Sequence, residues 1–80
     1  MLSLHVQYFA ILREQRGLAE EKLATTAGTP LALYDELRRL HHFTLPGDRV
    51  RAAVNDEFVD SHSALRDGDR VVFIPPVAGG

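Results

Sequence analysis

The chain has 80 residues, of which 45% are hydrophobic and 25% are charged, and its formal net charge is −2. This length allows one domain with a small core, and the weak negative charge argues against nucleic acid or an anionic membrane as a partner. Because the sequence contains no cysteine, it excludes disulfide scaffolds, cysteine-based zinc sites and thiol catalysis.

The sequence shows the pattern of neither a signal peptide nor a membrane span. Residues 1–5 lack a positive region followed by a long apolar stretch. No apolar run approaches the roughly 18 residues that a membrane helix needs. We therefore expect a cytoplasmic protein.

Two strands around a short helix are predicted for the N-terminal part. Residues 2–9 alternate between hydrophobic and polar side chains, as in a half-buried strand, and Phe9 is a large aromatic on the otherwise polar face. A short helix is expected over 10–16, where Gly17 is a suitable stop. A weaker strand over 20–25 is expected to run antiparallel to the first.

A longer helix is predicted over 30–42. Thr29 is a candidate N-cap. Pro30 suits the first helical position, because a backbone N–H there has no acceptor within the helix and its absence costs nothing. The helix carries an apolar stripe at spacing i, i+4, i+7, formed by Leu33, Leu37 and Leu40. The Pro-Gly-Asp sequence at 46–48 marks the end of this region.

Three short strands are predicted for the C-terminal half. Residues 50–54 and 58–59 form a hairpin around a polar turn. A single helical turn is expected over 61–65. The tight turn at 67–69, Asp-Gly-Asp, leads into a last strand over 70–74.

This order of elements indicates an α+β fold of the β-grasp type, as in ubiquitin. A single long helix must lie across one face of the sheet to bury its apolar stripe. A compact arrangement pairs the first strand with the last, parallel and central, in a mixed sheet of about five strands. We expect residues 1–74 to form this domain and residues 75–80 to form a flexible C-terminal tail.

The tail is apolar and stiff at its root. Residues 71–80 carry no charged side chain, and Pro75 and Pro76 end the last strand because neither has a backbone N–H to donate. A tail that only solvates a domain is normally polar. This tail instead fits insertion into another protein, with an extended reach on the order of 20 Å.

Gly79 and Gly80 make the C-terminal carboxylate a candidate reactive group. Glycines thread a slot too narrow for any side chain. ATP would convert the carboxylate of Gly80 to an acyl-adenylate, and a nucleophile would then take the acyl group with AMP as the leaving group. The alternative is an ordinary terminus of small, frayed residues.

The sheet face opposite the helix carries a candidate docking patch. Alternation along the last strand places Val71 and Phe73 in the core and Val72 and Ile74 on the open face. The patch would be continuous with the tail and consist of Phe9, Phe58 and Ile74. Such patches often mark partner sites, the alternative being three singly exposed residues.

On these residues the chain resembles the small, sulfur-carrying subunits of molybdopterin synthase, within the ubiquitin-like sulfur carriers of the ThiS type. The resemblance spans nearly the whole chain, with a looser middle from about residue 18 to 48, and the ordered C-terminal block is its specific part. The matching residues are Phe9-Ala10, Arg13-Glu14, Ala52-Ala53-Val54-Asn55, Leu65, Asp67-Gly68-Asp69, Val71, Phe73, Pro75-Pro76-Val77 and Gly79-Gly80.

The resemblance implies a function in molybdenum cofactor biosynthesis. An E1-like adenylyltransferase would adenylate Gly80 with ATP and magnesium, and a sulfurtransferase route would convert it to a thiocarboxylate. The sulfur would pass to cyclic pyranopterin monophosphate in a heterotetramer of two small and two large subunits. The chain itself would bind no cofactor or metal and would be a non-catalytic sulfur donor, active only with its large subunit.

The resemblance also implies roles for individual residues. The tail would thread the active site of the large subunit with Pro76, Val77, Ala78 and Gly79. The partner interface would consist of Phe9, Arg13, Phe58, Ile74 and Pro75. Ile74 stands where the family often has an aromatic residue, and Arg13 could equally be a solvated helix charge.

Two alternative functions share the fold and the Gly-Gly ending. One is a sulfur carrier for thiamine, tRNA or cysteine synthesis. The other is a ubiquitin-like modifier that is conjugated to lysines or only binds partners. The four histidines, His5, His41, His42 and His62, are too scattered to indicate a metal site.

Overall fold

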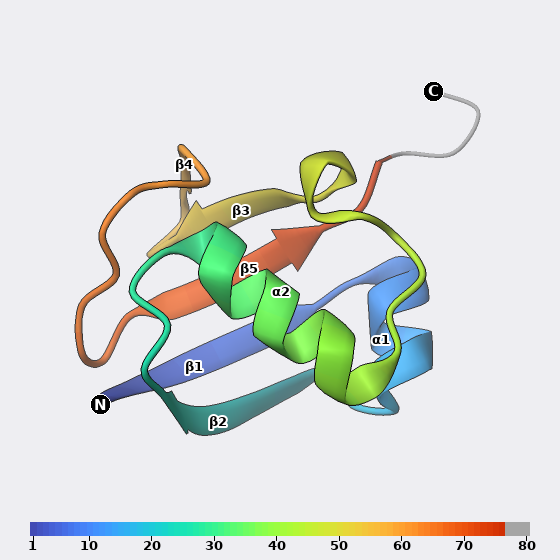
Figure 1. Cartoon of the computed structure of the whole chain (residues 1–80), viewed down its shortest axis with the longest axis horizontal. Coiled ribbons are helices and arrows are strands. Elements are labelled where there is room, and N and C mark those ends of the chain that lie inside the picture. Colours follow the sequence, from blue (N-terminus) through green and yellow to red (C-terminus); the bar gives the residue numbers. More distant parts are fainter. Residues whose placement is uncertain (77–80) are drawn as a thin grey trace.

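A five-stranded mixed sheet is covered on one face by the longer helix (Figure 1). The computed structural model describes residues 1–76, so the predictions for Val77, Ala78, Gly79 and Gly80 lie outside the described residues. The elements are β1 (Leu2–Tyr8), α1 (Ala10–Arg16), β2 (Glu20–Thr25), α2 (Pro30–His41), the short 3-10 helix η1 (Gly47–Arg49), β3 (Arg51–Val54), β4 (Glu57–Val59) and β5 (Arg70–Ile74).

The strand order β2-β1-β5-β3-β4 confirms the predicted topology. β1 and β5 are parallel and central, and Tyr8 lies opposite Phe73 at their C-terminal ends. β3 runs antiparallel to β5 and begins at the same end of the sheet, where Arg51 lies opposite Ile74. The polypeptide therefore leaves the sheet from the middle of one end, and not from an outer edge.

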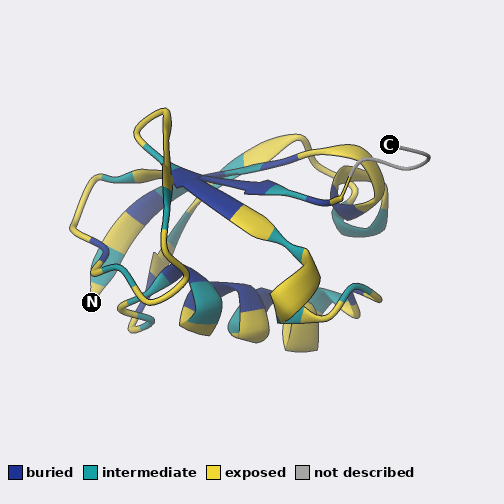
Figure 2. Ribbon diagram, turned by 90° about the horizontal axis from the view of Figure 1, so that it is seen from above, coloured by how far each residue is buried: buried dark blue, intermediate teal, exposed yellow. Residues whose placement is uncertain are grey.

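The core lies between the sheet and α2, as Figure 2 shows. The predicted alternation of β1 is confirmed, because Leu4, Val6 and Tyr8 are buried. Val71 and Phe73 of β5 are also buried, as expected. Other core residues come from α1, α2 and the loops: Leu12, Leu33, Tyr34, Leu37, Phe43, Ala52 and Leu65.

The helix α2 begins as predicted but presents a different apolar stripe. The Thr29 hydroxyl accepts a hydrogen bond from the backbone N–H of Ala32 at 3.2 Å. The prediction that Leu40 lies in the core is wrong, because its side chain is 61% exposed. The helix ends at His41, and the left-handed residue His42 (φ 58°) turns the chain so that Phe43 enters the core in its place.

The predicted helical turn over 61–65 is also wrong. Its backbone groups bond to distant partners: the Leu31 N–H donates to the Ser61 carbonyl at 3.0 Å, and the Leu65 N–H donates to the Gly28 carbonyl at 2.8 Å. Asp60 holds the start of the segment by accepting from the His62 N–H at 2.8 Å. These bonds tie the segment to the start of α2, and the local bond from the Ser63 N–H to the Asp60 carbonyl at 3.0 Å closes a turn and not a helix.

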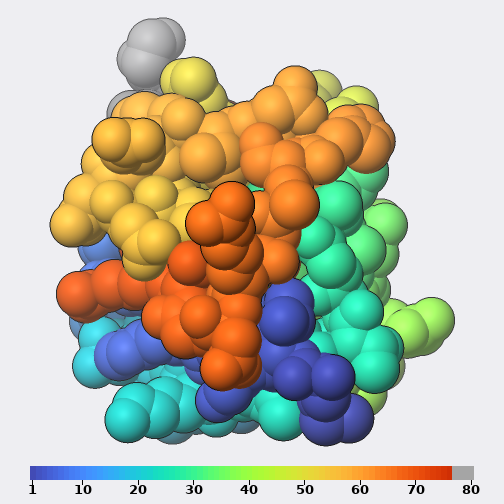
Figure 3. All heavy atoms as spheres, turned by 90° about the vertical axis from the view of Figure 1, so that its left-hand side faces the viewer, coloured from blue at the N-terminus to red at the C-terminus, as the bar shows by residue number. Residues whose placement is uncertain are grey.

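The segment 60–69 lies at the end of the molecule that carries the start of β1 (Figure 3). The Asp67 carboxylate accepts from the Ser3 N–H at 2.7 Å, and the Gly68 N–H donates to the Ser3 carbonyl at 2.7 Å. Gly68 has φ 86°, a conformation that favours glycine. The predicted tight turn at 67–69 therefore anchors β5 beside β1.

No helix within residues 1–76 has both the length and the apolar character needed to span a bilayer.

Candidate functional site

The root of the C-terminal tail is the end of β5. Ile74 is half-buried, Pro75 is buried and Pro76 is exposed. Both prolines lack a backbone N–H, so neither extends the ladder with β1 or β3. Burial of Pro75 fixes the direction in which the chain leaves the sheet at Pro76.

An open apolar depression of about 590 Å³ lies beside this root. Its walls come from the β1–α1 junction, from the loop after α2 and from the end of β5. They are formed by Phe9, Ala10, Ile11, Leu45, Ile74, Pro75 and Pro76. The structure thus brings together Phe9, Ile74, Pro75 and Pro76, which sequence reasoning had placed in one functional region.

Phe58 lies outside this depression. Its ring is 62% exposed on β4, which confirms that it faces outward. The Arg51 guanidinium lies 4.7 Å from the centroid of the Phe58 ring, and Arg51 is also the cross-strand partner of Ile74. A cation therefore separates the two apolar parts of the predicted patch.

Two further sequence expectations concern exposed positions. Arg13 is exposed on α1 and forms no ion pair with residues 1–76, so its predicted interface role stays a prediction. Val72 does face the open side, as expected, but it is only 8% exposed. Its neighbours on the two flanking strands, Gln7 and Ala53, cover it from both sides.

The wall of the depression contains a strained backbone residue. Ala10 begins α1 with φ 52°, in the left-handed region that non-glycine residues rarely adopt. Strain of this kind costs on the order of 1–3 kcal/mol and persists only where surrounding contacts enforce it. The sharp turn lets α1 start directly after β1 and sets Phe9 and Ile11 on the same depression.

A partly buried polar network holds α1 in this position, and sequence reasoning missed it. The Tyr8 hydroxyl donates to Glu21 Oε2 at 2.6 Å. The Arg16 guanidinium donates twice to the same carboxylate, from Nε and from a terminal nitrogen, each at 2.8 Å. The available signal was a tyrosine on a buried strand face, since a buried phenol needs a polar partner.

Charge and burial shift the ionisation of this network. The hydrogen bonds from Arg16 hold the pKa of Glu21 below its usual range, although partial burial opposes them. Burial, and then the hydrogen bond to Glu21, raises the pKa of Tyr8. The network is therefore an ionised carboxylate between a cation and a neutral phenol at neutral pH.

The substitution Glu21→Gln should lower the free energy of unfolding by about 1–3 kcal/mol at pH 7, because it removes a bidentate, charge-assisted pair. The folded pKa of Glu21 is lowered, so its contribution is fully present above the ordinary carboxylate pKa of about 4.3 and is lost as the pH falls through the folded value. Urea unfolding at pH 7 and in acid measures the difference. Glu14→Gln, at an exposed position on α1, is the matched control with no expected effect. A difference that stays constant into acid would contradict the assignment.

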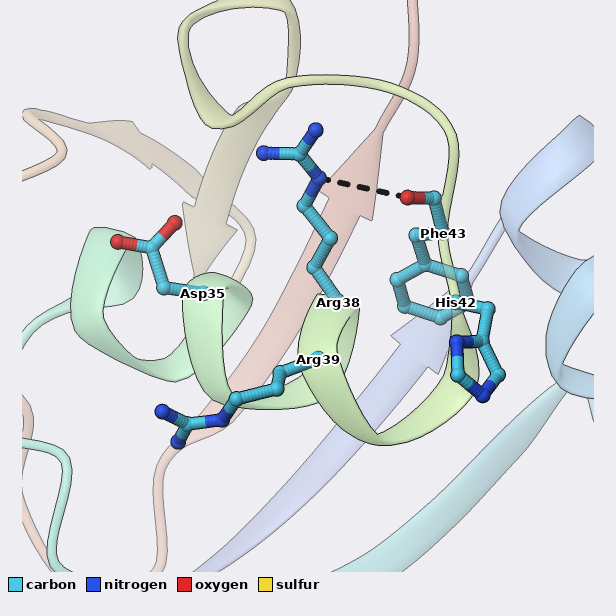
Figure 4. A pocket seen from close by; sticks show the side chains of 5 residues that line it. All are labelled: Asp35, Arg38, Arg39, His42 and Phe43. Atoms are coloured by element: carbon cyan, nitrogen blue, oxygen red, sulfur yellow. Dashed lines mark hydrogen bonds between the residues drawn. The ribbon is translucent and has the colours of Figure 1, made fainter.

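A second concavity, of about 690 Å³, lies at the end of α2 and is lined mostly by residues with charged side chains (Figure 4). Arg38 is partly engaged there, because its Nε donates to the Phe43 carbonyl at 3.3 Å. The other lining residues are Asp35, Arg39 and His42. This concavity holds none of the residues that the sequence singled out, and its cations suit the C-terminus of a helix, where they complement the dipole.

Among residues 1–76, no group of three or more His, Asp or Glu side chains is arranged to hold a metal ion. The described part of the molecule thus supplies an apolar depression and an anchored tail root.

Comparisons with known proteins agree with this geometry. The ThiS family profile matches residues 6–80. The molybdopterin synthase sulfur carrier subunit of Mycobacterium tuberculosis is 35% identical, with the whole of both chains covered. The same subunit from Escherichia coli is 34% identical over 96% of this chain and 99% of its own length.

Solved structures show the same fold. A putative molybdopterin converting factor subunit 1 from Pyrococcus furiosus has a TM-score of 0.80 and 31% identity, over 96% of this chain and all of its own. SAMP1 of Haloferax volcanii has a TM-score of 0.76 and 26% identity, over 98% and 99%. A chain from the BexX/CysO complex of Amycolatopsis orientalis has a TM-score of 0.67 and 26% identity, over 96% and 99%.

Proposed function

This chain belongs to the ThiS family, and we propose that it is the sulfur-carrier subunit of a molybdopterin synthase, with Gly80 as the residue that carries the sulfur. The observation that carries this proposal is the full-length similarity to a molybdopterin synthase sulfur carrier subunit, which includes the Gly79-Gly80 ending. The anchored root at Pro75 and the adjoining depression support it, because they present the tail from one end of a rigid sheet.

The proposed chemistry takes place on the carboxylate of Gly80. An E1-like adenylyltransferase joins it to the α-phosphate of ATP, with magnesium held by that enzyme, and pyrophosphate leaves. The persulfide sulfur of a donor protein then attacks the carbonyl carbon, and AMP departs with the bonding electrons. A thiolate, as the reductant, attacks the donor's sulfur in the acyl disulfide, so that the sulfur–sulfur bond breaks, a disulfide forms between the thiol and the donor, and a thiocarboxylate remains on Gly80. The chain contributes a tail without side-chain obstruction at its last two residues.

The large synthase subunit is the proposed partner at the moment of sulfur transfer. The tail would enter its active site, where cyclic pyranopterin monophosphate accepts the sulfur, in an assembly of two small and two large subunits. The apolar depression beside the tail root supports this proposal, since it offers a contact surface continuous with the inserted segment. The similar chain from Amycolatopsis orientalis was solved in a two-protein complex.

A second candidate function is that of a ubiquitin-like protein modifier. It is favoured by the likeness to SAMP1 of Haloferax volcanii, whose name is that of a modifier protein. The same activated Gly80 would then be joined to an amine of another protein. The two functions differ in the nucleophile that attacks the adenylate, a persulfide sulfur or a lysine nitrogen.

Complementation distinguishes these functions. We expect the chain to restore molybdoenzyme activity in a bacterial strain that lacks its molybdopterin synthase small subunit. It should not restore growth without thiamine to a strain that lacks the thiazole sulfur carrier. The reverse pattern would assign the chain to another sulfur pathway, and lysine-linked adducts without either rescue would favour a modifier.

A further inference from the structure

The chain contains a single lysine. Of its nine Lys and Arg residues, only Lys22 is a lysine, and the other cations are arginines. A guanidinium stays protonated in proteins and is not a nucleophile, whereas a lysine amine that loses its proton attacks activated carbonyl groups. Lys22 is therefore the only side-chain amine on this chain that an activated acyl group can modify.

Lys22 is accessible and unpaired within the described chain. It is exposed on β2, which is an edge strand of the sheet. No ion pair joins it to any of residues 1–76. It lines a shallow depression of about 290 Å³ on the side of the molecule opposite the tail root, together with Ser3, Leu4, His5 and Gly68.

An imidazole lies directly across the strand pair from this amine. His5 on β1 is the cross-strand partner of Lys22. In an antiparallel pair such partners have Cβ atoms about 4.5–5.5 Å apart and point to the same face. His5 Nε2 forms no hydrogen bond with the described residues and lies 3.6 Å from Glu20 Oε2. Lys22 and His5 thus line the same depression, and the Glu20 carboxylate beside Nε2 is placed to orient the imidazole.

We propose that Lys22 is the acceptor amine of this chain for an activated acyl group, with His5 as the base that removes the amine proton. The Lys22 ammonium first loses one proton to solvent, and the neutral Nζ then forms a bond to the acyl carbonyl carbon while one of its two remaining protons passes to the neutral imidazole of His5. The bond from that carbon to the phosphate oxygen breaks, and the phosphate or AMP leaves with the electron pair. The product is an amide on Lys22, and no oxidant or reductant takes part.

Two sources supply this chemistry. One is a small acyl phosphate. The other is the Gly80 adenylate of a second copy of the chain, which would give a covalent dimer, and this source rests on the proposed function. An edge lysine also discourages unwanted strand pairing, but that structural role does not require His5.

The first experiment uses acetyl phosphate and therefore does not depend on Gly80. The full chain carrying R66K provides an internal reference amine, since position 66 is exposed and its concavity contains no histidine. Site-resolved mass spectrometry at neutral pH should show acetylation of Lys22 faster than at position 66 by on the order of tenfold. In the additional variant His5→Gln this ratio should fall to about one, whereas His62→Gln, at an exposed histidine outside the depression, should leave it unchanged.

A ratio near one in the parent protein, or a ratio that His5→Gln does not change, would overturn the proposal. A second arm adds the activating enzyme with ATP and magnesium and looks for an amide between Gly80 and Lys22 that Lys22→Arg abolishes. Such a dimer identifies the chain's own C-terminus as a donor. If acetylation depends on His5 but no dimer forms, the proposal stands with small acyl donors as the source, and the chain's own C-terminus is excluded as the donor.

Discussion

Removal of Gly80 should abolish sulfur transfer and leave the folded domain unchanged. The proposed reaction forms every new bond at the carbonyl carbon of this residue, so a chain that ends at Gly79 places its carboxylate about 3.5 Å short of the reacting position. Misplacement of reacting atoms by even 1 Å can reduce a rate by about a hundredfold. The measurement is molybdopterin formation in a reconstituted assay with the large subunit, the activating enzyme and a sulfur donor.

The matched control for this deletion is Leu40→Ala. This variant keeps the full-length C-terminus and alters one exposed side chain of the folded domain, on α2. It should retain full activity. Addition of one residue after Gly80 should be as harmful as the deletion, because it moves the carboxylate out of register with the activating site. Normal activity of either altered terminus, together with an unchanged circular dichroism spectrum, would contradict the proposed role of Gly80.

A charge at the tail-root depression should weaken binding to the large subunit by roughly 30-fold to 1,000-fold, as expected when an interface anchor worth about 2–4 kcal/mol is lost. Ile74→Glu and Phe9→Glu each place a carboxylate on the apolar wall beside Pro75. Burying that charge against a partner without a counter-ion is costly. Both side chains are partly exposed in the free chain, so the domain should still fold.

Titration calorimetry with the purified large subunit measures this effect. Leu40→Glu introduces the same charge on the helical layer, away from the depression, and should leave the dissociation constant unchanged. Phe58→Ala should have a smaller effect than Ile74→Glu, because Phe58 lies outside the depression and the change introduces no charge. Unchanged affinity of both Ile74→Glu and Phe9→Glu would exclude the depression from the interface.

The sequence was sufficient for the fold because its local signals agree with one another. Alternation over β1, the Thr29-Pro30 helix start and the turn at 67–69 all predict elements that the structure contains. Each signal has a local physical cause, and their order leaves few ways to cover one sheet face with one long helix.

The incorrect predictions concern segments whose local structure is determined by contacts with residues distant in the sequence. Leu40 has the spacing of a core residue, but the left-handed turn at His42 brings Phe43 into the core, where it stacks on Tyr34 with ring centroids 5.8 Å apart. A helical turn is predicted over residues 61–65, but backbone groups of this segment bond to residues at the start of α2. Neither outcome has a signal within the segment itself.

The candidate site was predictable only where strand alternation and sheet topology determine it. Phe9, Ile74 and Pro75 follow from strand alternation and from the topology that places β1 beside β5, and they do lie together. The separation of Phe58 by Arg51 depends on the register of β3, and the Tyr8–Glu21–Arg16 network depends on the approach of α1 to β2. Sequence periodicity predicts which face of a strand or helix a side chain occupies. It does not predict which residue of another element that side chain contacts, so these contacts are known only from the three-dimensional structure.

We propose that Gly80 itself becomes the sulfur-bearing group. Intact-mass spectrometry of the chain after incubation with the activating enzyme, ATP, magnesium and a persulfide donor tests it most directly. We expect a gain of about 16 Da, the replacement of one oxygen by sulfur, confined to the C-terminal fragment and absent when the C-terminus is amidated. An unchanged mass under conditions that still deliver sulfur to the pterin, or full sulfur delivery by the amidated chain, would contradict it.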